Sequence, residues 1–375
     1  MNASQGKSAP LVVYGATGYT GKLIAAELAS SGHDFVLAGR NQSKLEALAA
    51  ELELDVPLHA ISTGESKAMR DLFSGCGAVI ACAGPFYLHG DPVLAAAVDV
   101  GTHYLDTTGE QPFIRKAMDQ YGPRAAKNGS CVISGMGFDY VPGDMLAGMT
   151  ADGLGPLDQV RLAYRTKFQP TRGTMLSALE MIKGGDLEWR NGGLWPAPQS
   201  ISRGRFDFGE AVGEQAMTRY PAGEHITVPR HVDTRRVETM LSADSVAPGP
   251  LARLAPLVAR PAGVAMRTPL KKLTGRLIDR LPEGADPESR RAATWTVGCE
   301  AIVGNRIRRG WISGNDVYGF TAALLVKGAA LAAAGEIGTA GALAPAQAFN
   351  PETFLEGFDR FSVRWEIEPL DRPTT

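Results

Sequence analysis

The sequence is poor in the features that identify secreted, metal-binding or membrane proteins. It has only 4 cysteines in 375 residues, with no C-x-x-C pair and no metal-spaced histidines, so we expect free thiols in a reducing cytoplasm and no metal site. Residues 1–9 are polar and lack the apolar core of a signal peptide. The weakly polar stretch 320–346 is interrupted by Lys327 and Glu336, which predicts a buried helix rather than a membrane span.

Charge and motif content exclude further classes. The formal net charge is −2, so composition gives no reason to expect a nucleic-acid partner, and no DNA- or RNA-reading motif is present. A G-x-S-x-G nucleophile turn is also absent, so the sequence lacks this motif for hydrolase chemistry. The length predicts two to three domains, and a hydrophobic fraction of 44% allows ample cores.

Three glycines at a spacing of three stand between an apolar run, residues 11–13, and a helical pattern, residues 22–30. A strand, a glycine-rich turn and a helix in this order are typical of a dinucleotide site, where the pyrophosphate lies at the helix N-terminus. Such turns also occur for purely steric reasons. The residues expected to hold the phosphates are Gly15, Thr17, Gly18, Tyr19, Thr20 and Gly21.

The next strand pattern, residues 34–38, indicates which dinucleotide is bound. It ends in Gly39-Arg40 and lacks the acid that accepts the ribose 2′-hydroxyl of NAD. Arg40 instead offers a guanidinium suited to a 2′-phosphate, with Lys44 one helical turn further on. Ser43 is expected to cap that helix and to donate to the same phosphate. The pattern therefore favours NADP(H), the alternative being that these cations are merely solvated.

Short apolar runs alternate with helical patterns up to about residue 150, which predicts an α/β fold with a Rossmann-type, doubly wound parallel sheet. Further strands are expected at 78–82, 104–106 and 131–133, and helices at 22–30, 44–52, 67–73, 92–100 and 112–127. The turn Ala83, Gly84, Pro85 and Phe86 follows the fourth strand and is expected beside the cofactor's ribose and nicotinamide, with Phe86 on one ring face. The alternative is an ordinary turn with a core phenylalanine.

Several motifs together resemble the saccharopine dehydrogenase-like oxidoreductases, most closely the branch that includes the trans-acting enoyl reductases. They are YGATGYTGKL (14–23), LAGR (37–40), GPF (84–86), GTHYLDTTGE (101–110) and GFDYVP (137–142). The resemblance implies an NADP-binding Rossmann domain over 1–150, a mixed α+β substrate domain over 151–315, and a C-terminal segment, 316–375, that returns to the first domain. It implies hydride transfer to a C=C (enoyl) or C=N (imine) acceptor without fixing the substrate.

The sequence departs from the pattern of this family at two places. Tyr140 and Gly143 stand where the family usually has serine, and Arg172-Gly173-Thr174 replaces a Gly-Gly-Thr triplet. Tyr140 and Asp139 are the catalytic candidates, because a phenol can protonate a developing anion. Arg172 and Thr174 are the substrate candidates. Alternatively, Tyr140 fills a domain junction, Arg172 is solvated, and Asp139 orders the glycine turn by accepting backbone N–H bonds.

The second domain carries two strand patterns, at 159–165 and 293–303, separated by an irregular stretch, 184–223, that suggests a lid or binding loop. Aromatic side chains of that stretch either line an apolar substrate or anchor the loop to its own domain. They are Trp189, Trp195, Phe206 and Phe208. An enoyl acceptor would use this apolar lining, whereas an imine from an amino acid would need carboxylate clamps, for which Arg172, Arg230, Arg235 and Arg236 are candidates.

A basic amphipathic pattern over 253–280 leaves a membrane surface or an acidic carrier protein open as a partner, but an ordinary helix with a solvated face is favoured. The expected partner is a small-molecule or carrier-bound acyl substrate, and a homodimer is compatible with the sequence. None of the nine tyrosines has a lysine four residues later, which disfavours the short-chain dehydrogenase/reductases. The competing interpretation from another class is a non-catalytic NADPH-binding sensor or scaffold.

Overall fold

The computed structural model describes residues 9–167, 171–172, 186–198, 203–209, 212–246 and 284–370. The chain divides into two compact units. The first comprises Met1–Thr108, Phe113–Gly137 and Thr321–Leu343, and the second comprises Gly109–Pro112, Phe138–Phe320 and Ala344–Thr375.

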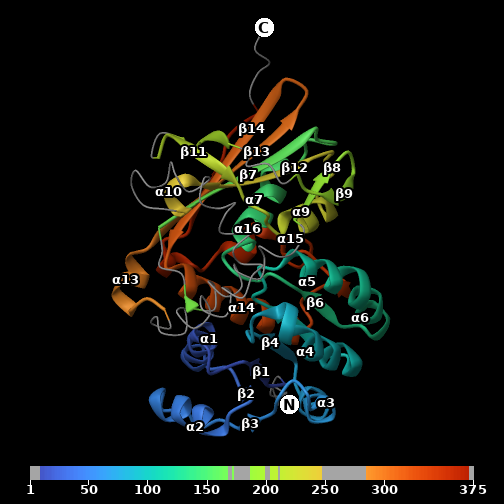
Figure 1. Cartoon of the computed structure of the whole chain (residues 1–375), viewed down its shortest axis with the longest axis vertical. Coiled ribbons are helices and arrows are strands. Elements are labelled where there is room, and N and C mark those ends of the chain that lie inside the picture. The colour runs from blue at the N-terminus through green and yellow to red at the C-terminus, as the bar shows by residue number, and fades with distance from the viewer. Residues whose placement is uncertain are drawn as a thin grey trace, which may run out of the picture. The chain divides into compact units, whose positions relative to one another are not determined.

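The first unit contains a seven-stranded sheet with the order β15-β6-β5-β4-β1-β2-β3, in which every pair is parallel (Figure 1). Its strands are β1 (Leu11–Tyr14), β2 (Phe35–Gly39), β3 (Leu58–Ala60), β4 (Ala78–Ala81), β5 (His103–Asp106), β6 (Cys131–Ile133) and β15 (Gly341–Ala342). Every residue of β1, β2 and β4 is buried, as expected for a parallel sheet covered on both faces. The order from β3 to β6 is that of a Rossmann fold, so the predicted fold class is confirmed.

Helices connect these strands. They are α1 (Tyr19–Ser30), α2 (Gln42–Glu51), α3 (Ser66–Phe73), α4 (Phe86–Val100), α5 (Gln111–Lys116), η1 (Ala117–Tyr121), α6 (Gly122–Asn128) and α14 (Val317–Ala333). Two predicted helices were wrong in extent. Helix α4 begins at Phe86, which packs on Phe113, and contains Pro92 in its interior rather than at its start. The helix expected over 112–127 is divided by a π-helical stretch before Gly122-Pro123, where proline removes a backbone donor.

The second unit contains a mixed seven-stranded sheet with the order β10-β11-β12-β7-β13-β14-β16, in which only β12 and β7 pair in parallel. Its strands are β7 (Gln159–Thr166), β10 (Arg203–Asp207), β11 (Glu214–Arg219), β12 (Val237–Ser242), β13 (Thr294–Val303), β14 (Arg306–Asn315) and β16 (Arg364–Ile367). A separate hairpin joins β8 (Leu187–Arg190) and β9 (Gly193–Pro196). Strands β7 and β13 confirm the two strand patterns.

The stretch 184–223, which the sequence predicted to be an irregular lid or binding loop, contributes strands and core residues. Its described part contains four strands, and Phe206 and Phe208 are buried against Ala163, Met217 and Met240. The sheet curls enough that a Cβ atom on Gly298 of β13 would lie 2.3 Å from the Phe206 ring of β10. Strands this short, broken by glycines, give no clear alternation in the sequence.

Short helices complete the second unit: α7 (Val141–Ala151), α9 (Glu224–Thr227), η2 (Val228–Arg230), α10 (Ala243–Val246), α13 (Pro287–Ala292), α15 (Pro345–Ala348), α16 (Pro351–Leu355) and η4 (Asp359–Phe361). Helix α7 packs against β13 and β14, where a Cβ atom on Gly310 would lie 3.2 Å from Leu146. Trp295 stacks on Phe320 at a centroid distance of 5.3 Å, and Phe320 also contacts Phe358 and Phe361.

The C-terminal segment is shared between the units. Residues 321–343 return to the first unit through α14 and β15, as expected, but β16 pairs with β14 in the second unit. The expectation that all of 316–375 returns to the first domain was therefore wrong. The boundaries also fall at 137 and 320 rather than at 150 and 315. Among the described helices, none is long and apolar enough to cross a membrane.

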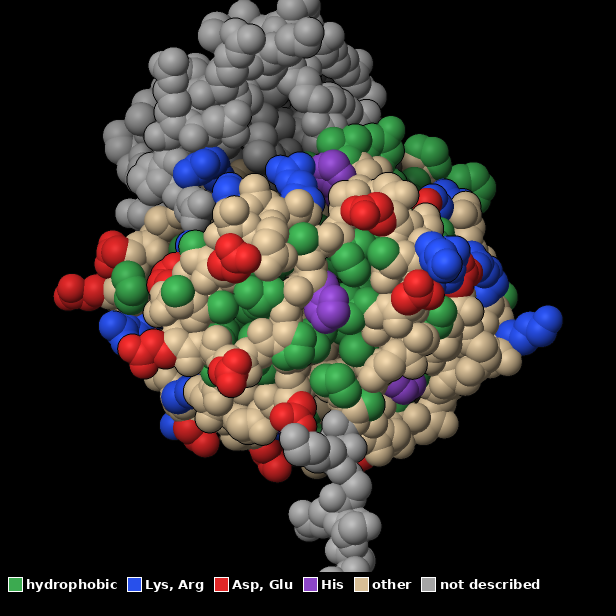
Figure 2. Space-filling model, turned by 90° about the horizontal axis from the view of Figure 1, so that it is seen from below, with side chains coloured by type: hydrophobic (Ala, Val, Ile, Leu, Met, Phe, Trp, Pro, Cys, Tyr) green, Lys and Arg blue, Asp and Glu red, His purple; other side chains and the backbone are tan. Residues whose placement is uncertain are grey.

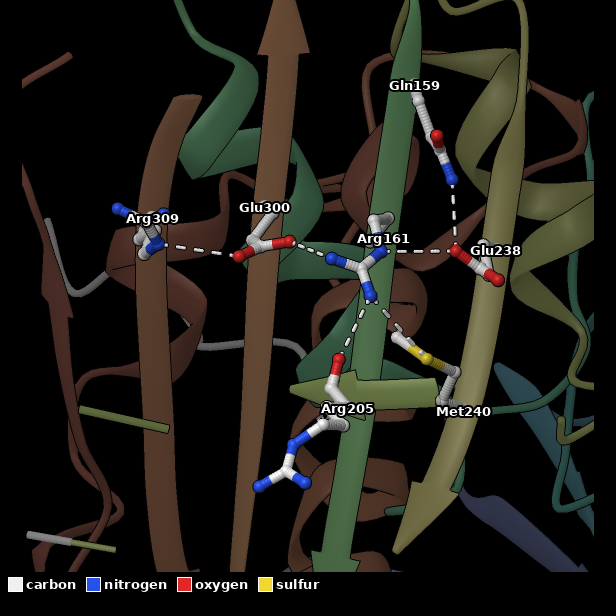
Figure 3. A network of polar contacts seen from close by, with 7 residues as sticks. All are labelled: Gln159, Arg161, Arg205, Glu238, Met240, Glu300 and Arg309. Atoms are coloured by element: carbon white, nitrogen blue, oxygen red, sulfur yellow. Dashed lines mark hydrogen bonds and ion pairs between the residues drawn. The ribbon is translucent and has the colours of Figure 1, made fainter. Parts of the chain in front are cut away.

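A polar network lies on one face of the second sheet (Figure 3). Arg161 of β7 contacts Glu300 of β13 on one side and donates to Glu238 of β12 at 3.1 Å on the other, while Arg309 of β14 lies 3.4 Å from the second oxygen of Glu300. The Glu300 side chain is only 8% exposed, and two guanidinium groups compensate its burial.

The surface drawn in Figure 2 carries basic and acidic side chains interspersed around its rim. Among the described residues of this face, neither sign of charge forms a continuous field.

Candidate functional site

The turn between β1 and α1 is shaped by two glycines that the backbone requires. Gly15 has φ +87°, and a Cβ atom there would lie 2.8 Å from the Ala83 nitrogen. A Cβ atom on Gly21 would lie 2.5 Å from the Gly15 carbonyl oxygen. The loop after β1 therefore lies directly against the turn after β4 and against the first turn of α1, an approach that only glycine permits.

The start of α1 is suited to an anion. Its N-cap, Gly18, has no side chain to cap the first turn, and that turn contains no acidic residue. A Cβ atom on Gly18 would meet its nearest neighbour at 3.5 Å, so the fold does not require glycine there. The backbone N–H groups and positive dipole end of α1 are available to a phosphate near Thr17, Tyr19 and Thr20, which are partly exposed.

Arg40 lies at the carboxyl end of β2 and is exposed, as are Ser43 and Lys44 of α2. The prediction that Ser43 caps α2 was wrong: the N-cap is Asn41, which accepts from the Lys44 N–H at 3.0 Å, and Ser43 lies within the first turn. No carboxylate forms an ion pair with Arg40 or Lys44 in the described part of the chain. Both cations therefore remain available for a 2′-phosphate.

In the turn after β4, the structure does not favour the role expected of Phe86, which was to cover one face of the nicotinamide ring. The Gly84–Pro85 peptide bond is cis, Gly84 is exposed and Ala83 is partly exposed. Phe86 is only 4% exposed and packs on Phe113, with ring centroids 5.6 Å apart, which favours the core interpretation over a ring-covering role. The large side chains exposed at this turn are instead Tyr87 and Leu88, which the sequence did not single out.

A buried carboxylate at the end of β5 orders the glycine turn after β6. Asp106 is fully buried and accepts from the Thr108 N–H at 2.9 Å, the Gly135 N–H at 3.0 Å and the Ser134 hydroxyl at 2.8 Å. Burial raises its pKa to about 6, although these hydrogen bonds oppose the shift. The expectation that Asp139 accepts these backbone bonds was wrong, because in the described structure no N–H donates to it.

Asp139 belongs to a different group of side chains, which we call the phenol–carboxyl cluster. It lies entirely in the second unit and comprises Asp139, Tyr140, Tyr164, Tyr220 and Glu224. The Tyr164 hydroxyl of β7 donates to Oε1 of Glu224, the first residue of α9, and the Tyr164 and Tyr220 rings lie 6.2 Å apart. Sequence reasoning identified Asp139 and Tyr140 but missed the other three, which are distant in the chain.

Glu224 is fully buried and its Oε2 atom has no hydrogen-bond partner. Burial raises the pKa of Glu224 well above 4.5, opposed by the Tyr164 hydrogen bond and reinforced by the negative charges of Asp144 and Asp139. No arginine or lysine compensates this carboxyl group in the described structure, unlike Glu300 in Figure 3. Burial without a compensating cation therefore favours the neutral form of Glu224.

Tyr140 and Asp139 occupy different positions in the cluster. Tyr140 is 1% exposed and donates its hydroxyl to the Gly109 carbonyl oxygen, and burial raises its pKa well above 10. Its proton is committed to the backbone, which favours the structural interpretation. Asp139 is partly exposed, and desolvation raises its pKa to about 6, a value suited to proton transfer near neutral pH.

Gly143 of α7 explains one of the departures from the family pattern. A Cβ atom on Gly143 would lie 2.1 Å from the Tyr164 hydroxyl oxygen and 2.7 Å from Glu224 Oε1. A serine at this position would displace the Tyr164–Glu224 pair. The absence of a side chain here is therefore a condition for the pair to form.

A second series of buried hydrogen bonds leads to the backbone of Tyr220, a member of the cluster. The Trp189 N–H donates to His225 Nδ1 at 3.2 Å, which leaves the proton on Nε2, 3.0 Å from the Thr239 hydroxyl. Thr239 in turn donates to the Tyr220 carbonyl oxygen. Burial lowers the pKa of His225 to about 3, so this histidine stays neutral and fixes the backbone next to Tyr220.

A buried carboxyl group, Asp144, holds α7 in place as well. Asp144 accepts from the Ala346 N–H at 2.9 Å, and its other oxygen lies 3.0 Å from His231 Nε2. Burial alone would raise the pKa of Asp144, but His231 and the hydrogen bonds lower it overall.

The remaining substrate candidates are dispersed. Arg172 is partly buried, Thr174 and the basic stretch 253–280 lie outside the described residues, and Arg230, Arg235 and Arg236 are exposed. Trp189 donates from Nε1 to the Thr234 carbonyl oxygen at 2.8 Å and, like Phe206 and Phe208, anchors its own unit. Trp195 is 50% exposed, with the Arg190 guanidinium 5.8 Å from its ring centroid.

The strand order of the first unit, its glycine turn and the open N-terminus of α1 define a Rossmann-type dinucleotide-binding domain. More particularly, residues 11–133 match the model of the saccharopine dehydrogenase NADP-binding domain. The resemblance seen in the sequence motifs is thereby confirmed, and the cofactor is NADP(H).

Relatives of known name agree with this assignment. A trans-acting enoyl reductase of Mycobacterium tuberculosis is 30% identical over 188 residues, which are 49% of this chain and 42% of the relative. A saccharopine dehydrogenase-like oxidoreductase of Arabidopsis thaliana is 32% identical over 149 residues, which are 36% of this chain and 33% of the relative. The chain thus spans less than half the length of these curated relatives.

The fold of the whole chain also has a counterpart among solved structures. Saccharopine dehydrogenase (L-Glu forming) of Saccharomyces cerevisiae superposes with a TM-score of 0.63, covering 96% of this chain and 100% of that one. The sequence identity is 13%, so this likeness concerns the fold alone.

Proposed function

We propose that the protein is an NADPH-dependent reductase that transfers a hydride to a polarised C=C or C=N bond of a small-molecule or carrier-bound acyl substrate in the cytoplasm. The observation that carries the choice of NADPH is the pair of unpaired cations, Arg40 and Lys44, at a strand end that has no acid. The open start of α1 supports the pyrophosphate half of the same assignment.

The residues present fit NADP(H). Gly15 and Gly21 allow the close packing of the loop after β1, Gly18 leaves the start of α1 without a side chain where the pyrophosphate would bind, and Arg40 with Lys44 would bind the 2′-phosphate. Bound there, the cofactor supplies a hydride, and the reaction then needs one proton for the acceptor.

Asp139 is our candidate for the proton source. It is partly exposed, accepts no hydrogen bond in the described structure, and burial raises its pKa to about 6. A carboxyl group with this pKa is protonated in a useful fraction near neutral pH and recovers its proton from solvent. Tyr140 is the weaker candidate because its hydroxyl already donates to Gly109.

The first experiment is a titration of the purified protein with NADPH and with NADH, following quenching of its 5 tryptophans. Strong preference for NADPH that Arg40→Ala removes supports the cofactor assignment. Equal binding of both dinucleotides contradicts the role of Arg40.

Turnover separates the reductase from a sensor or scaffold. Oxidation of NADPH in the presence of enoyl thioesters or cyclic imines, absent without them, supports the enzyme. Tight binding without turnover of any acceptor in such a panel supports the non-catalytic alternative.

A further inference from the structure

The Tyr164–Glu224 pair leaves one buried carboxyl oxygen of the second unit without a partner. Glu224 is fully buried, Tyr164 is 2% exposed, and the Tyr164 hydroxyl donates to Glu224 Oε1. A tyrosine hydroxyl has one proton, so Oε1 is already occupied as an acceptor. The other oxygen of Glu224, Oε2, is buried and has no partner.

A buried carboxyl group in this setting holds its proton on Oε2. No guanidinium or ammonium group compensates Glu224 in the described structure, whereas Glu300, in the same unit, contacts both Arg161 and Arg309. The neighbouring carboxyl groups, Asp139 and Asp144, both disfavour a further negative charge on Glu224. The O–H group on Oε2 is then a donor without an acceptor, which is unusual for a buried polar group.

We propose that Glu224, held neutral and oriented by Tyr164, donates a hydrogen bond from Oε2 to the carbonyl oxygen of a conjugated acyl substrate, so that the acceptor bond is C=C rather than C=N. The proposal rests on the proposed reductase function. Asp139 and Tyr220 are the partly exposed members of the cluster, and the proposal requires a ligand to approach the pair from their side.

The reduction of an enoyl group requires such a donor at the hydride-transfer step. When the hydride adds to the β-carbon of an enoyl group, the electron pair of the C=C bond shifts toward the carbonyl group, and its oxygen becomes an enolate oxyanion. A neutral carboxylic acid in a dry site stabilises an oxyanion by hydrogen bonding, and the combination with a tyrosine is an established form of oxyanion hole. A proton added to the α-carbon then completes the saturated acyl group. An imine has no carbonyl oxygen on which such an oxyanion develops, so its reduction does not require this donor.

Three variants separate these roles. Glu224→Gln replaces the O–H donor with an N–H donor of the same shape, Glu224→Leu removes the donor, and Glu238→Gln, on the polar face of Figure 3, is the matched control. With the N-acetylcysteamine thioester of crotonic acid, we expect Glu224→Gln to retain kcat/KM within about threefold and Glu224→Leu to lose about 100- to 1,000-fold. Wild-type activity should fall as pH rises through the pKa of Glu224, and the Glu224→Gln profile should lack this fall.

Loss of activity in Glu224→Gln as large as in Glu224→Leu would mean that Glu224 acts as a carboxylate and would overturn the proposal. Turnover of 1-pyrroline by the wild type, with none of the enoyl thioester, would overturn it as well.

Infrared spectroscopy tests the same point without turnover. The difference between wild type and Glu224→Gln at neutral pH should contain the carbonyl band of a protonated carboxylic acid, and its absence would overturn the proposal whatever the activity. The carbonyl band of a ¹³C-labelled crotonyl thioester should shift to lower frequency on binding to the wild type but not to Glu224→Leu. If both bands behave as expected and no acceptor is ever reduced, the proposed reductase function fails while the donor site stands.

Discussion

The first unit presents backbone N–H groups after β1 and two unpaired cations after β2, whereas around Tyr164 the second unit buries carboxyl groups among phenols with no compensating cation in the described structure. The first arrangement attracts a permanent anion such as a phosphate. The second disfavours charge and raises the pKa of its carboxyl groups. One region therefore suits the binding of a charged cofactor, and the other suits the stabilisation of charge that develops during a reaction.

The two regions also differ in what would destroy them. The phosphate cradle depends on backbone geometry at Gly15 and Gly21, so a single methyl group meets main-chain atoms that cannot move independently. The phenol–carboxyl cluster depends on side-chain orientation, so a single methyl group displaces side chains while the fold persists. Each region can thus be disrupted separately.

The largest expected effect is that of Gly21→Ala on cofactor binding. The new Cβ atom would lie 2.5 Å from the Gly15 oxygen and 2.7 Å from the Ala16 oxygen, so the loop has to shift. Overpacking of this kind costs roughly 1–3 kcal/mol, and we expect NADPH affinity to fall about 100-fold in the fluorescence titration. Gly64→Ala is the control, since its Cβ atom would meet nothing closer than 3.9 Å. An unchanged NADPH affinity in Gly21→Ala would contradict the cradle.

Gly143→Ala, in the phenol–carboxyl cluster, should show the opposite pattern, with an effect on turnover rather than on NADPH affinity. The added Cβ atom would lie 2.1 Å from the end of the Tyr164 side chain, so the ring shifts and the Tyr164–Glu224 hydrogen bond is lost. We expect turnover to drop about 100-fold with unchanged NADPH affinity.

The matched control is Gly148→Ala on the same helix, whose Cβ atom would have its nearest contact at 3.6 Å and which should raise helix stability slightly. A parallel loss of NADPH affinity in Gly143→Ala would show that the two regions are not independent.

The contrast also explains which parts were predictable from sequence. The first unit follows from short contiguous patterns, because Gly15, Gly18 and Gly21 lie in one turn and Arg40 follows the next strand. The sequence gives little sign of the cluster, because Tyr164, Tyr220 and Glu224 come from separate elements and the burial of an acid leaves no periodic signal. The one hint was the pair of departures at Tyr140 and Gly143, since Gly143 is where the pair needs space.

Errors elsewhere have similar physical causes. Phe86 follows a glycine-proline turn, and nothing local indicates that it packs on Phe113, 27 residues later. Ser43 and Asn41 are both good caps, and the choice depends on where α2 begins. Asp106 and Asp139 each lie near a glycine turn, and only the tertiary structure shows which one accepts its N–H bonds.

A smaller effect is expected for the cations that select the dinucleotide. Arg40→Ala removes charge-assisted hydrogen bonds worth roughly 1.5–3 kcal/mol, so NADPH affinity should fall about 30-fold while NADH affinity stays constant. Lys127→Ala, an exposed lysine on α6, should change neither. Equal losses of affinity for both dinucleotides would indicate that Arg40 binds the pyrophosphate, which both share, rather than the 2′-phosphate.

The smallest effects, and the sharpest contrast, concern two carboxyl groups whose pKa burial raises to about 6, Asp106 in the first unit and Asp139 in the second. Because each folded-state pKa lies above the unfolded value, each carboxyl group favours the folded state at low pH, and this contribution is lost as pH rises through about 6. Asp139 accepts no N–H hydrogen bond that a substitution could remove, so Asp139→Asn should raise Tm at neutral pH. It should not raise Tm at a pH below the pKa of Asp139 in the unfolded state. Turnover should fall about tenfold.

Asp106→Asn should instead lower Tm at neutral pH. The amide cannot accept from Thr108, Gly135 and Ser134 together, so one donor loses its partner, and we expect a loss of about 1–3 kcal/mol at neutral pH. Thermal melts of both variants at neutral and acid pH measure this difference. If both variants lower Tm equally at neutral pH, Asp139 contributes to the fold as Asp106 does. If only Asp139→Asn raises it, the chain keeps a destabilising acid at Asp139, which is expected of a group retained for catalysis rather than for stability.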